Sequence, residues 1–332
     1  MVLLYSLPIV ASYIIEPTSF WIIASCYVLS GIGMIGIGMG VMHDANHGSY
    51  SSNKKHNKFF GGLIWIIGAS PLSWKIQHNT LHHTFTNVEG YDEDIDVPLV
   101  LRFSPHGKKL WIHKFQAFYF WLLYGLTTLI WVTVKDFFSI ARYRKMGYIK
   151  SGKEVTKEAT KLVIWKLIYF TYMLVVPIYL RPDFAMEIVG AFLIMHFISG
   201  LILSLVFQAA HVMTDIAFPL PDENQEVDNN WLVHQLQTTT NFAPKNKVLS
   251  WFIGGLNFQV EHHLFPNISH VHYPKLSKVI RETVEEFGFE YQLRSSFTQA
   301  ILDHVKMLHR LGRMEAIELP SLATPNIKLS VQ

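Results

Sequence analysis

The chain carries three short histidine-rich segments, which we call box 1, box 2 and box 3. Box 1 is H-D-A-N-H at residues 43–47, box 2 is H-N-T-L-H-H at 78–83, and box 3 is Q-V-E-H-H at 259–263. On a helix, the i, i+3 and i, i+4 spacings inside the boxes place side chains on one face, where they can converge on a metal ion. The predicted ligands are His43, His47, His78, His82, His83, His262 and His263.

An eighth histidine extends this set. His211 closes a long apolar segment in Q-A-A-H and is our choice for the additional ligand, whereas His234, in W-L-V-H-Q-L-Q, is a weaker metal candidate. Eight imidazoles exceed what one ion binds, so the sequence indicates two metal ions. Imidazole suits Zn, Cu, Fe or Ni, and the ligands alone do not identify the metal. A lipid-facing site implies work on a hydrocarbon chain, for which zinc is redox-inert, whereas iron with O₂ is competent.

The composition indicates an integral membrane protein. Half of the 332 residues are hydrophobic, 14% are aromatic and only 16% are charged, a balance far from that of a soluble domain. The single cysteine, Cys26, excludes disulfides and cysteine-ligated clusters within the chain. The net charge of +3 is modest and forms no patch of the kind that binds nucleic acid. No linker or repeat divides the sequence, so we expect one domain over residues 1–332.

Apolar segments of about 20 residues predict the membrane spans. We expect about four crossings, over residues 2–15, 20–42, 162–180 and 185–210. Residues 59–72 are too few to cross and are interrupted by glycines, so they are expected to lie in the interface.

The distribution of Lys and Arg sets the predicted topology. Basic residues are concentrated between residues 54 and 114 and again between 135 and 161, which places both segments in the cytoplasm. Residues 115–134 then begin and end on the same side, as an interfacial or re-entrant helix. This all-α membrane fold gathers the boxes in a cytoplasmic histidine-rich cap that holds the two metals, made of residues 43–114, 135–161 and 211–332.

The boxes and their surroundings resemble the membrane fatty acid desaturases, from His43 to about Pro274. In box 3, Gln259 replaces the first histidine usual in stearoyl-type desaturases, and the segment G-G-L-N-F-Q-V-E-H-H-L-F-P-N-I-S-H-V-H-Y-P resembles front-end desaturases. A-H-V at 210–212 and T-T-N-F at 239–242 resemble bacterial and cyanobacterial members of that group. The resemblance implies two irons bound by the three boxes and His211. It also implies O₂ as co-substrate and a cis double bond placed at a delta-6- or delta-5-like position.

The resemblance also implies partners. Eukaryotic front-end desaturases usually carry a fused cytochrome-b5-like domain with an H-P-G-G motif, and this sequence has no such motif. We therefore expect no fused haem and a separate electron donor, such as ferredoxin or a cytochrome-b5-like protein with its reductase. The expected substrate is a fatty acyl chain linked to lipid, coenzyme A or acyl carrier protein. We expect a multi-pass integral membrane protein surrounded by membrane lipids, in the inner membrane if the source is a bacterium. Its active site is expected on the cytoplasmic face.

Several polar residues beside the boxes are expected to support the ligands or to set regioselectivity: Gln259, Asp44, Asp94, Asp96 and Glu261. Glu89, Asp92 and Glu93 either form hydrogen bonds to the ligand histidines or lie in a solvated loop, and the sequence favours neither alternative. The rival functions are a membrane di-iron lipid or carotenoid hydroxylase or ketolase, and a metal transporter. Transport is disfavoured because the boxes lie beyond the ends of the spans instead of at mid-membrane.

Overall fold

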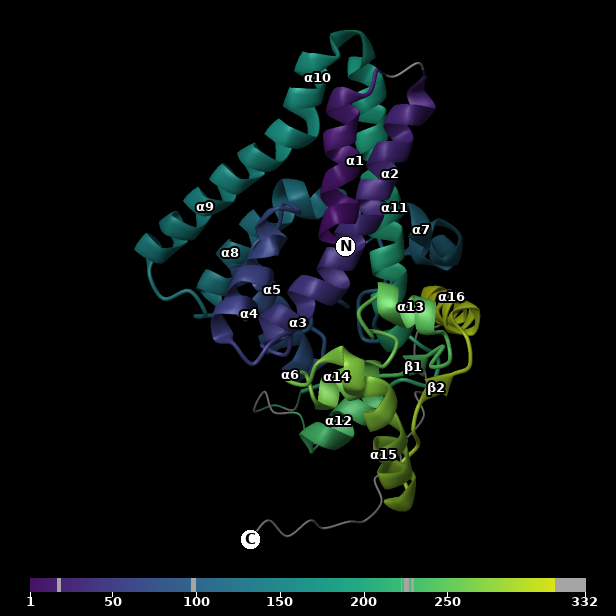
Figure 1. Cartoon of the computed structure of the whole chain (residues 1–332). Coiled ribbons are helices and arrows are strands. Elements are labelled where there is room, and N and C mark those ends of the chain that lie inside the picture. The colour runs from purple at the N-terminus through teal and green to yellow at the C-terminus, as the bar shows by residue number, and fades with distance from the viewer. Residues whose placement is uncertain (17–18, 97–99, 222, 224–226, 228–229, 314–332) are drawn as a thin grey trace. The chain divides into compact units, whose positions relative to one another are not determined.

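The computed structural model describes residues 1–16, 19–96, 100–221, 223, 227 and 230–313. These residues are mainly helical (Figure 1). The chain divides into two compact units: unit 1 contains residues 1–79, 121–205 and 252–254, and unit 2 contains residues 80–120, 206–251 and 255–332. The predicted cap reaches into residues 314–332, which lie outside the described ranges.

Unit 1 contains the longest apolar helices. Its elements, with two that continue into unit 2, are α1 (Val2–Ile14), α2 (Phe20–Gly36), η1 (Ile37–Val41), α3 (Met42–His47), α4 (Lys54–Gly61), η2 (Gly62–Trp65), α5 (Pro71–Trp74), α7 (Gln116–Ile130), η5 (Trp131–Lys135), α8 (Asp136–Lys145), α9 (Gly152–Phe170), η6 (Thr171–Val175), α10 (Val176–Leu180), η7 (Pro182–Phe184) and α11 (Ala185–His211). Segments η1, η5 and η6 are π-helical.

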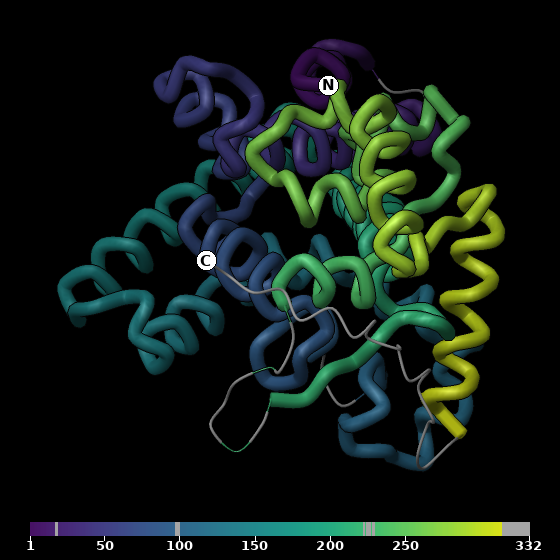
Figure 2. The backbone as a smooth tube through the Cα atoms, turned by 90° about the horizontal axis from the view of Figure 1, so that it is seen from below, coloured from purple at the N-terminus to yellow at the C-terminus, as the bar shows by residue number. Residues whose placement is uncertain are grey.

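Helices α1 and α2 lie side by side in both views (Figures 1 and 2). Gly33 makes this packing possible, because a Cβ there would lie 2.3 Å from the backbone nitrogen of Tyr5. Tyr27 is fully buried in the same core and donates a hydrogen bond to the carbonyl of Met173. Close helix contact through a small residue is typical of membrane proteins.

Four helices among the described residues are long and apolar enough to cross a membrane: Phe20–His47, Trp111–Lys145, Gly152–Leu180 and Pro182–His211. This confirms the prediction of an all-α membrane protein. Three of them contain the predicted spans 20–42, 162–180 and 185–210. The fourth contains residues 115–134, which we expected in the interface, whereas Val2–Ile14 has only 13 residues. The paths of residues 2–15 and 115–134 relative to the bilayer stay predictions.

Unit 2 is built from shorter elements and carries box 3. They are η3 (Lys75–His82, which begins in unit 1), α6 (His83–Phe85), η4 (Trp111–Phe115), α12 (Trp231–Thr238), α13 (Lys247–Phe252, which ends in unit 1), α14 (Gln259–Leu264), η8 (His270–His272), α15 (Tyr273–Glu286), α16 (Phe297–Arg313) and the parallel strands β1 (Asn241–Phe242) and β2 (Leu293–Arg294).

The core of unit 2 next to box 3 is apolar. Val260 of α14 packs with Leu236 of α12 and with Ile280 and Val284 of α15. At the other side of the unit, α16 contacts η4, and Figure 2 shows this pair side by side. The amphipathic helices α15 and α16 therefore use their apolar faces to hold the segment that carries box 3 and the segment that follows box 2.

Candidate metal centre

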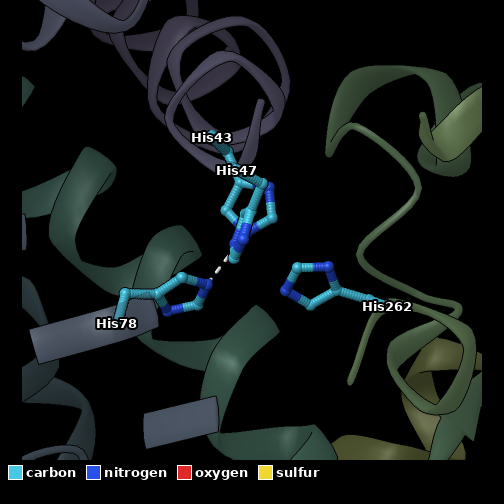
Figure 3. A group of neighbouring side chains, drawn as sticks. All are labelled: His43, His47, His78 and His262. Atoms are coloured by element: carbon cyan, nitrogen blue, oxygen red, sulfur yellow. Dashed lines mark hydrogen bonds between the residues drawn. The ribbon is translucent and has the colours of Figure 1, made fainter. Parts of the chain in front are cut away.

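In unit 1, three histidines of boxes 1 and 2 form a buried group. His43 and His47 project from α3 and His78 from η3, and Figure 3 shows their rings turned toward one another. The Nε2 atoms of His43 and His78 lie 3.1 Å apart, and the ring centroids of the three residues are separated by 4.7–5.1 Å. Nitrogen atoms at this spacing can bind one ion.

The surroundings hold these rings in place. The indole of Trp74 touches all three, with centroid distances of 4.5 Å to His78, 5.5 Å to His43 and 5.6 Å to His47. Asn79 donates a hydrogen bond of 3.1 Å to the carbonyl of Asn46, which ties η3 to α3. Packing and backbone contacts thus fix the directions of the imidazoles.

In unit 2, His82, His211 and His263 form a second buried group. Each offers a ring nitrogen, and these nitrogens lie within 4.8 Å of one another. The ring centroids are 4.8–4.9 Å apart. The three residues come from η3, the end of α11 and α14, so the fold of unit 2 brings together residues that are far apart in the sequence.

Each ring of this second group is anchored through Nδ1. The Nδ1 of His82 lies 3.1 Å from both oxygens of Asp92, that of His211 lies 3.1 Å from the carbonyl of Thr238, and that of His263 lies 2.8 Å from Oε1 of Gln235. Since all three partners are acceptors, the imidazoles carry their proton on Nδ1. Nε2 then bears the lone pair that a metal needs.

His83 and His262 form a further pair in unit 2. Their Nε2 atoms lie 3.0 Å apart, and Nδ1 of His262 lies 3.3 Å from the hydroxyl of Tyr273. The ring of His83 also stacks on that of His263 at 4.4 Å. Unit 2 therefore gathers five of the eight predicted ligands and unit 1 gathers the other three.

This donor set fits first-row transition metals that bind imidazole. His82, His211 and His263, whose Nδ1 atoms face acceptors, have the arrangement found around metal-bound histidines. A model of the family described as "Fatty acid desaturase" matches residues 18–295.

The chain belongs to the fatty acid desaturase family.

Relatives with functional names agree with this membership. The sn-1 linoleoyl-lipid 6-desaturase of Synechocystis sp. is 36% identical over 289 residues, which cover 87% of this chain and 80% of the relative. The enzyme of the same name from Arthrospira platensis is 33% identical over 297 residues, covering 89% and 80%. The acyl-lipid (8-3)-desaturase of Physcomitrium patens is 35% identical over 281 residues, covering 84% and 58%. The enzyme is accordingly an oxidoreductase that acts as a fatty acid desaturase.

Asp92 dominates the electrostatics around the second group of this desaturase. Its side chain is fully buried and also accepts backbone hydrogen bonds from Asn87 at 2.9 Å and Asp94 at 3.0 Å. Burial lowers the pKa of His82, but the carboxylates of Asp92 and Asp94 outweigh it and raise that pKa to about 9. The same negative field favours a bound cation.

The polar residues predicted beside the boxes have different surroundings. Asp94 lies 3.4 Å from Nδ1 of His82, and Asp44 lies 3.6 Å from Nδ1 of His43, whereas Asp96 is exposed. Gln259 is buried, and its side chain opposes the lowering of the His211 pKa that burial causes. The weaker candidate His234 is outside both groups, and its Nε2 donates to the carbonyl of Thr86 at 2.9 Å.

Glu261 was expected to face a neighbouring imidazole, but its contacts are elsewhere. Its carboxylate accepts hydrogen bonds from Asn241 at 2.7 Å and from the Tyr291 hydroxyl at 2.5 Å. Burial raises the pKa of Glu261, and the hydrogen bonds from Tyr291 and Asn241 oppose that rise. The residue therefore links α14 to strand β1 and to the segment before β2.

Several contacts of the site were missed from the sequence. Asp92 could have been singled out only as one of several carboxylates after box 2. Thr238, Gln235 and Tyr273 carry no sequence signal, because a carbonyl, an amide and a phenol are common everywhere. Trp74 lies four residues before His78, a helical spacing from which its contact with box 2 could have been predicted.

Proposed function

We propose that the enzyme is an O₂-dependent di-iron front-end desaturase that inserts a cis double bond into a lipid-linked acyl chain. The observation that supports this most is the anchoring of His82, His211 and His263 through Nδ1, which prepares three Nε2 atoms for one ion. We assign a second ion to the group of His43, His47 and His78 in unit 1. His83 and His262 complete the proposed set of eight ligands.

The chemistry supplied by bound iron and O₂ is the removal of two hydrogens from adjacent acyl carbons. The balance requires two further electrons and two protons, so that both oxygen atoms leave as water. The electrons come from a separate donor protein of the ferredoxin or cytochrome-b5 kind, which we place on the cytoplasmic side with the boxes. A separate donor would supply the electrons that a redox-active metal pair needs in each turnover.

The chain's own residues have defined roles in this proposal. Asp92, Thr238 and Gln235 hold a proton of each of three imidazoles at Nδ1, so that Nε2 is the more basic nitrogen presented to a metal ion. Trp74 shields the first group, since it is 4% exposed and contacts all three rings. Exclusion of water from a strongly oxidising site protects both the substrate and the protein.

The proposed regiochemistry is delta-6-like. Two relatives that cover most of this chain are named linoleoyl-lipid 6-desaturases. Gln259 is the box 3 residue that stands where other desaturases have histidine, and it lies beside His211. A position next to a ligand is suited to adjusting where the acyl chain is held relative to the metals.

The test is expression in a host that is fed linoleic acid, followed by mass spectrometry of the fatty acids with assignment of the double bonds. We expect a product two mass units lighter (loss of two hydrogens), with the new bond on the carboxyl side of the existing ones. A product heavier by one oxygen atom would instead identify a hydroxylase and refute the proposal.

Two variants test the residues. His262→Ala should abolish the product and lower the iron content, and an undiminished product would show that His262 is no ligand. Gln259→His tests regiochemistry: if the residue acts there, activity persists with a changed product pattern. An unchanged pattern would remove Gln259 from this role.

A further inference from the structure

The surface of unit 2 has a groove that the proposed reaction does not use. It has a volume of about 480 Å³ and is lined by Ala117 and Phe118 of α7, Thr214, and Val305, Lys306, His309 and Arg310 of α16. Its volume is in the range of pockets that hold small ligands. The lining combines an apolar floor with a cationic rim.

The groove is held by a fixed contact between α16 and the segment before α7. Gly312 lets the helix approach closely, because a Cβ there would lie 2.0 Å from the carbonyl oxygen of His113. Gln116 donates to the carbonyl of Leu308 at 2.8 Å, and Arg102 donates to that of Leu311 at 2.7 Å. The two walls therefore keep their spacing without a ligand.

The charges on the rim are positive. Lys306 is bonded to Asp303 at 2.9 Å, but its side chain is 69% exposed and an ammonium has three donors. Asp303 is also paired with Arg294 at 2.7 Å, and Arg294 is itself paired with Asp215, so these two carboxylates and two cations balance and Lys306 contributes through its exposed donors. Arg310 adds a second permanent cation to the lining. An occupant with an anionic group is favoured here.

The aromatic residues at the groove locate it at a membrane surface. Phe118 is 70% exposed and Trp111, seven residues before it, is 75% exposed. Both belong to Trp111–Lys145, a helix apolar enough to cross the bilayer. Exposed aromatic residues at the end of such a helix are typical of the headgroup region. An acidic protein partner would not require these apolar surfaces.

We propose that this groove binds an anionic phospholipid, with an acyl chain against Ala117, Phe118 and Val305 and the phosphate between Lys306 and Arg310. The occupant matches both the apolar floor and the cationic rim. The proposal does not depend on the desaturation chemistry, since none of these residues is a proposed metal ligand.

The experiment uses the full chain in nanodiscs of equal parts phosphatidylcholine and phosphatidylglycerol, released into native mass spectrometry. The wild type should retain phosphatidylglycerol in preference to phosphatidylcholine. The double variant Lys306→Gln/Arg310→Gln should weaken this retention about 30-fold, from ~1 kcal/mol for each removed charge near an anionic surface.

Two further variants make the test specific. Lys153→Gln/Lys157→Gln removes the same charge from exposed positions on α9 and should leave retention unchanged. Ala117→Phe keeps every charge but fills the groove, and should also release the lipid. Equal retention by the wild type and the rim variant, an equal loss in the α9 control, or no effect of Ala117→Phe would each overturn the proposal. The proposal would also be overturned if the rim variant kept its lipid but lost turnover supported by the electron donor, because the two cations would then serve the donor protein.

Discussion

Replacement of Asp92 by asparagine should weaken iron binding strongly without removing a ligand. Asparagine has nearly the same shape, but it has no charge and only one acceptor oxygen. Asp92 uses two oxygens at 3.1 Å from His82 and also accepts from the backbone of Asn87. The variant therefore loses both the field that favours a cation and the fixed orientation of the His82 ring.

The size of the effect follows from the burial of this carboxylate. Partners of metal-bound histidines are worth about 10- to 100-fold in metal affinity, or ~1.4–2.7 kcal/mol. We expect the upper end for Asp92, because it is fully buried and no water screens its charge. Asp94→Asn is the matched control: its carboxylate lies 3.4 Å from the same nitrogen but is 22% exposed, so we expect less than about a tenfold loss.

The assay is anaerobic titration of the purified metal-free enzyme with Fe²⁺ against a competing chelator. Thermal unfolding of the metal-free proteins, measured in parallel, shows whether the loop around Asp92 keeps its fold. If Asp92→Asn binds iron as the wild type does, or if Asp94→Asn is equally impaired, the assignment of Asp92 as the principal support of His82 is wrong.

Three other outcomes are expected. Lys166→Met should cost about 3–5 kcal/mol of stability in detergent, since it leaves the buried Asp136 unpaired and breaks bonds to three backbone carbonyls. Arg281→Met, which removes an exposed pair within α15, should change stability little, and equal costs would contradict this reasoning. Burial lowers the pKa of His304 to about 4; the unfolded chain therefore binds its proton first as pH falls below about 6.5, and stability should drop by about 3 kcal/mol on reaching pH 4. Unfolding measured against pH should lose this component in His304→Gln, and an unchanged slope would refute it. Trp74→Ala should lower iron retention, measured by metal analysis, more than Trp65→Ala, which removes an indole stacked on Trp165.

Much of the site was predictable because its chemistry is concentrated in a few sequence segments. Seven histidines were identified by type and spacing, and His211 by its place at the end of an apolar segment and by the resemblance. The structure gathers His43, His47 and His78 in unit 1 and the other five in unit 2. Long apolar helices containing residues 20–42, 162–180 and 185–210 were predictable, since uninterrupted apolar length is a direct requirement of the bilayer. The convergence of both histidine groups on one metal pair stays a prediction.

The supporting contacts were not predictable, because they depend on backbone paths. Asp92 is one of several similar carboxylates, and its selection follows from a turn in which Asn87 has a φ of 61° and donates its N–H to that carboxylate. Glu261 looked equivalent to Asp44 in the sequence, yet strand β1 brings Asn241 to it. Local pattern does not encode which of two like side chains faces a ligand.

The π-helical segment Ile37–Val41 has a consequence for how the enzyme tolerates insertion and deletion. A π-turn closes its hydrogen bonds from i to i+5, so it holds more residues than an α-turn. Because a π-turn takes up one residue more than an α-turn, loss of one residue from this segment would restore an ordinary α-helix and leave box 1 aimed much as before. Loss of one residue from the regular part of α2 would instead rotate everything after it by about 100°. His43 and His47 would then swing away from Trp74, although every side chain that lines the site was kept. The aim of box 1 is thus set by the length of the regular helix before the π-helical segment, which itself tolerates the loss of one residue.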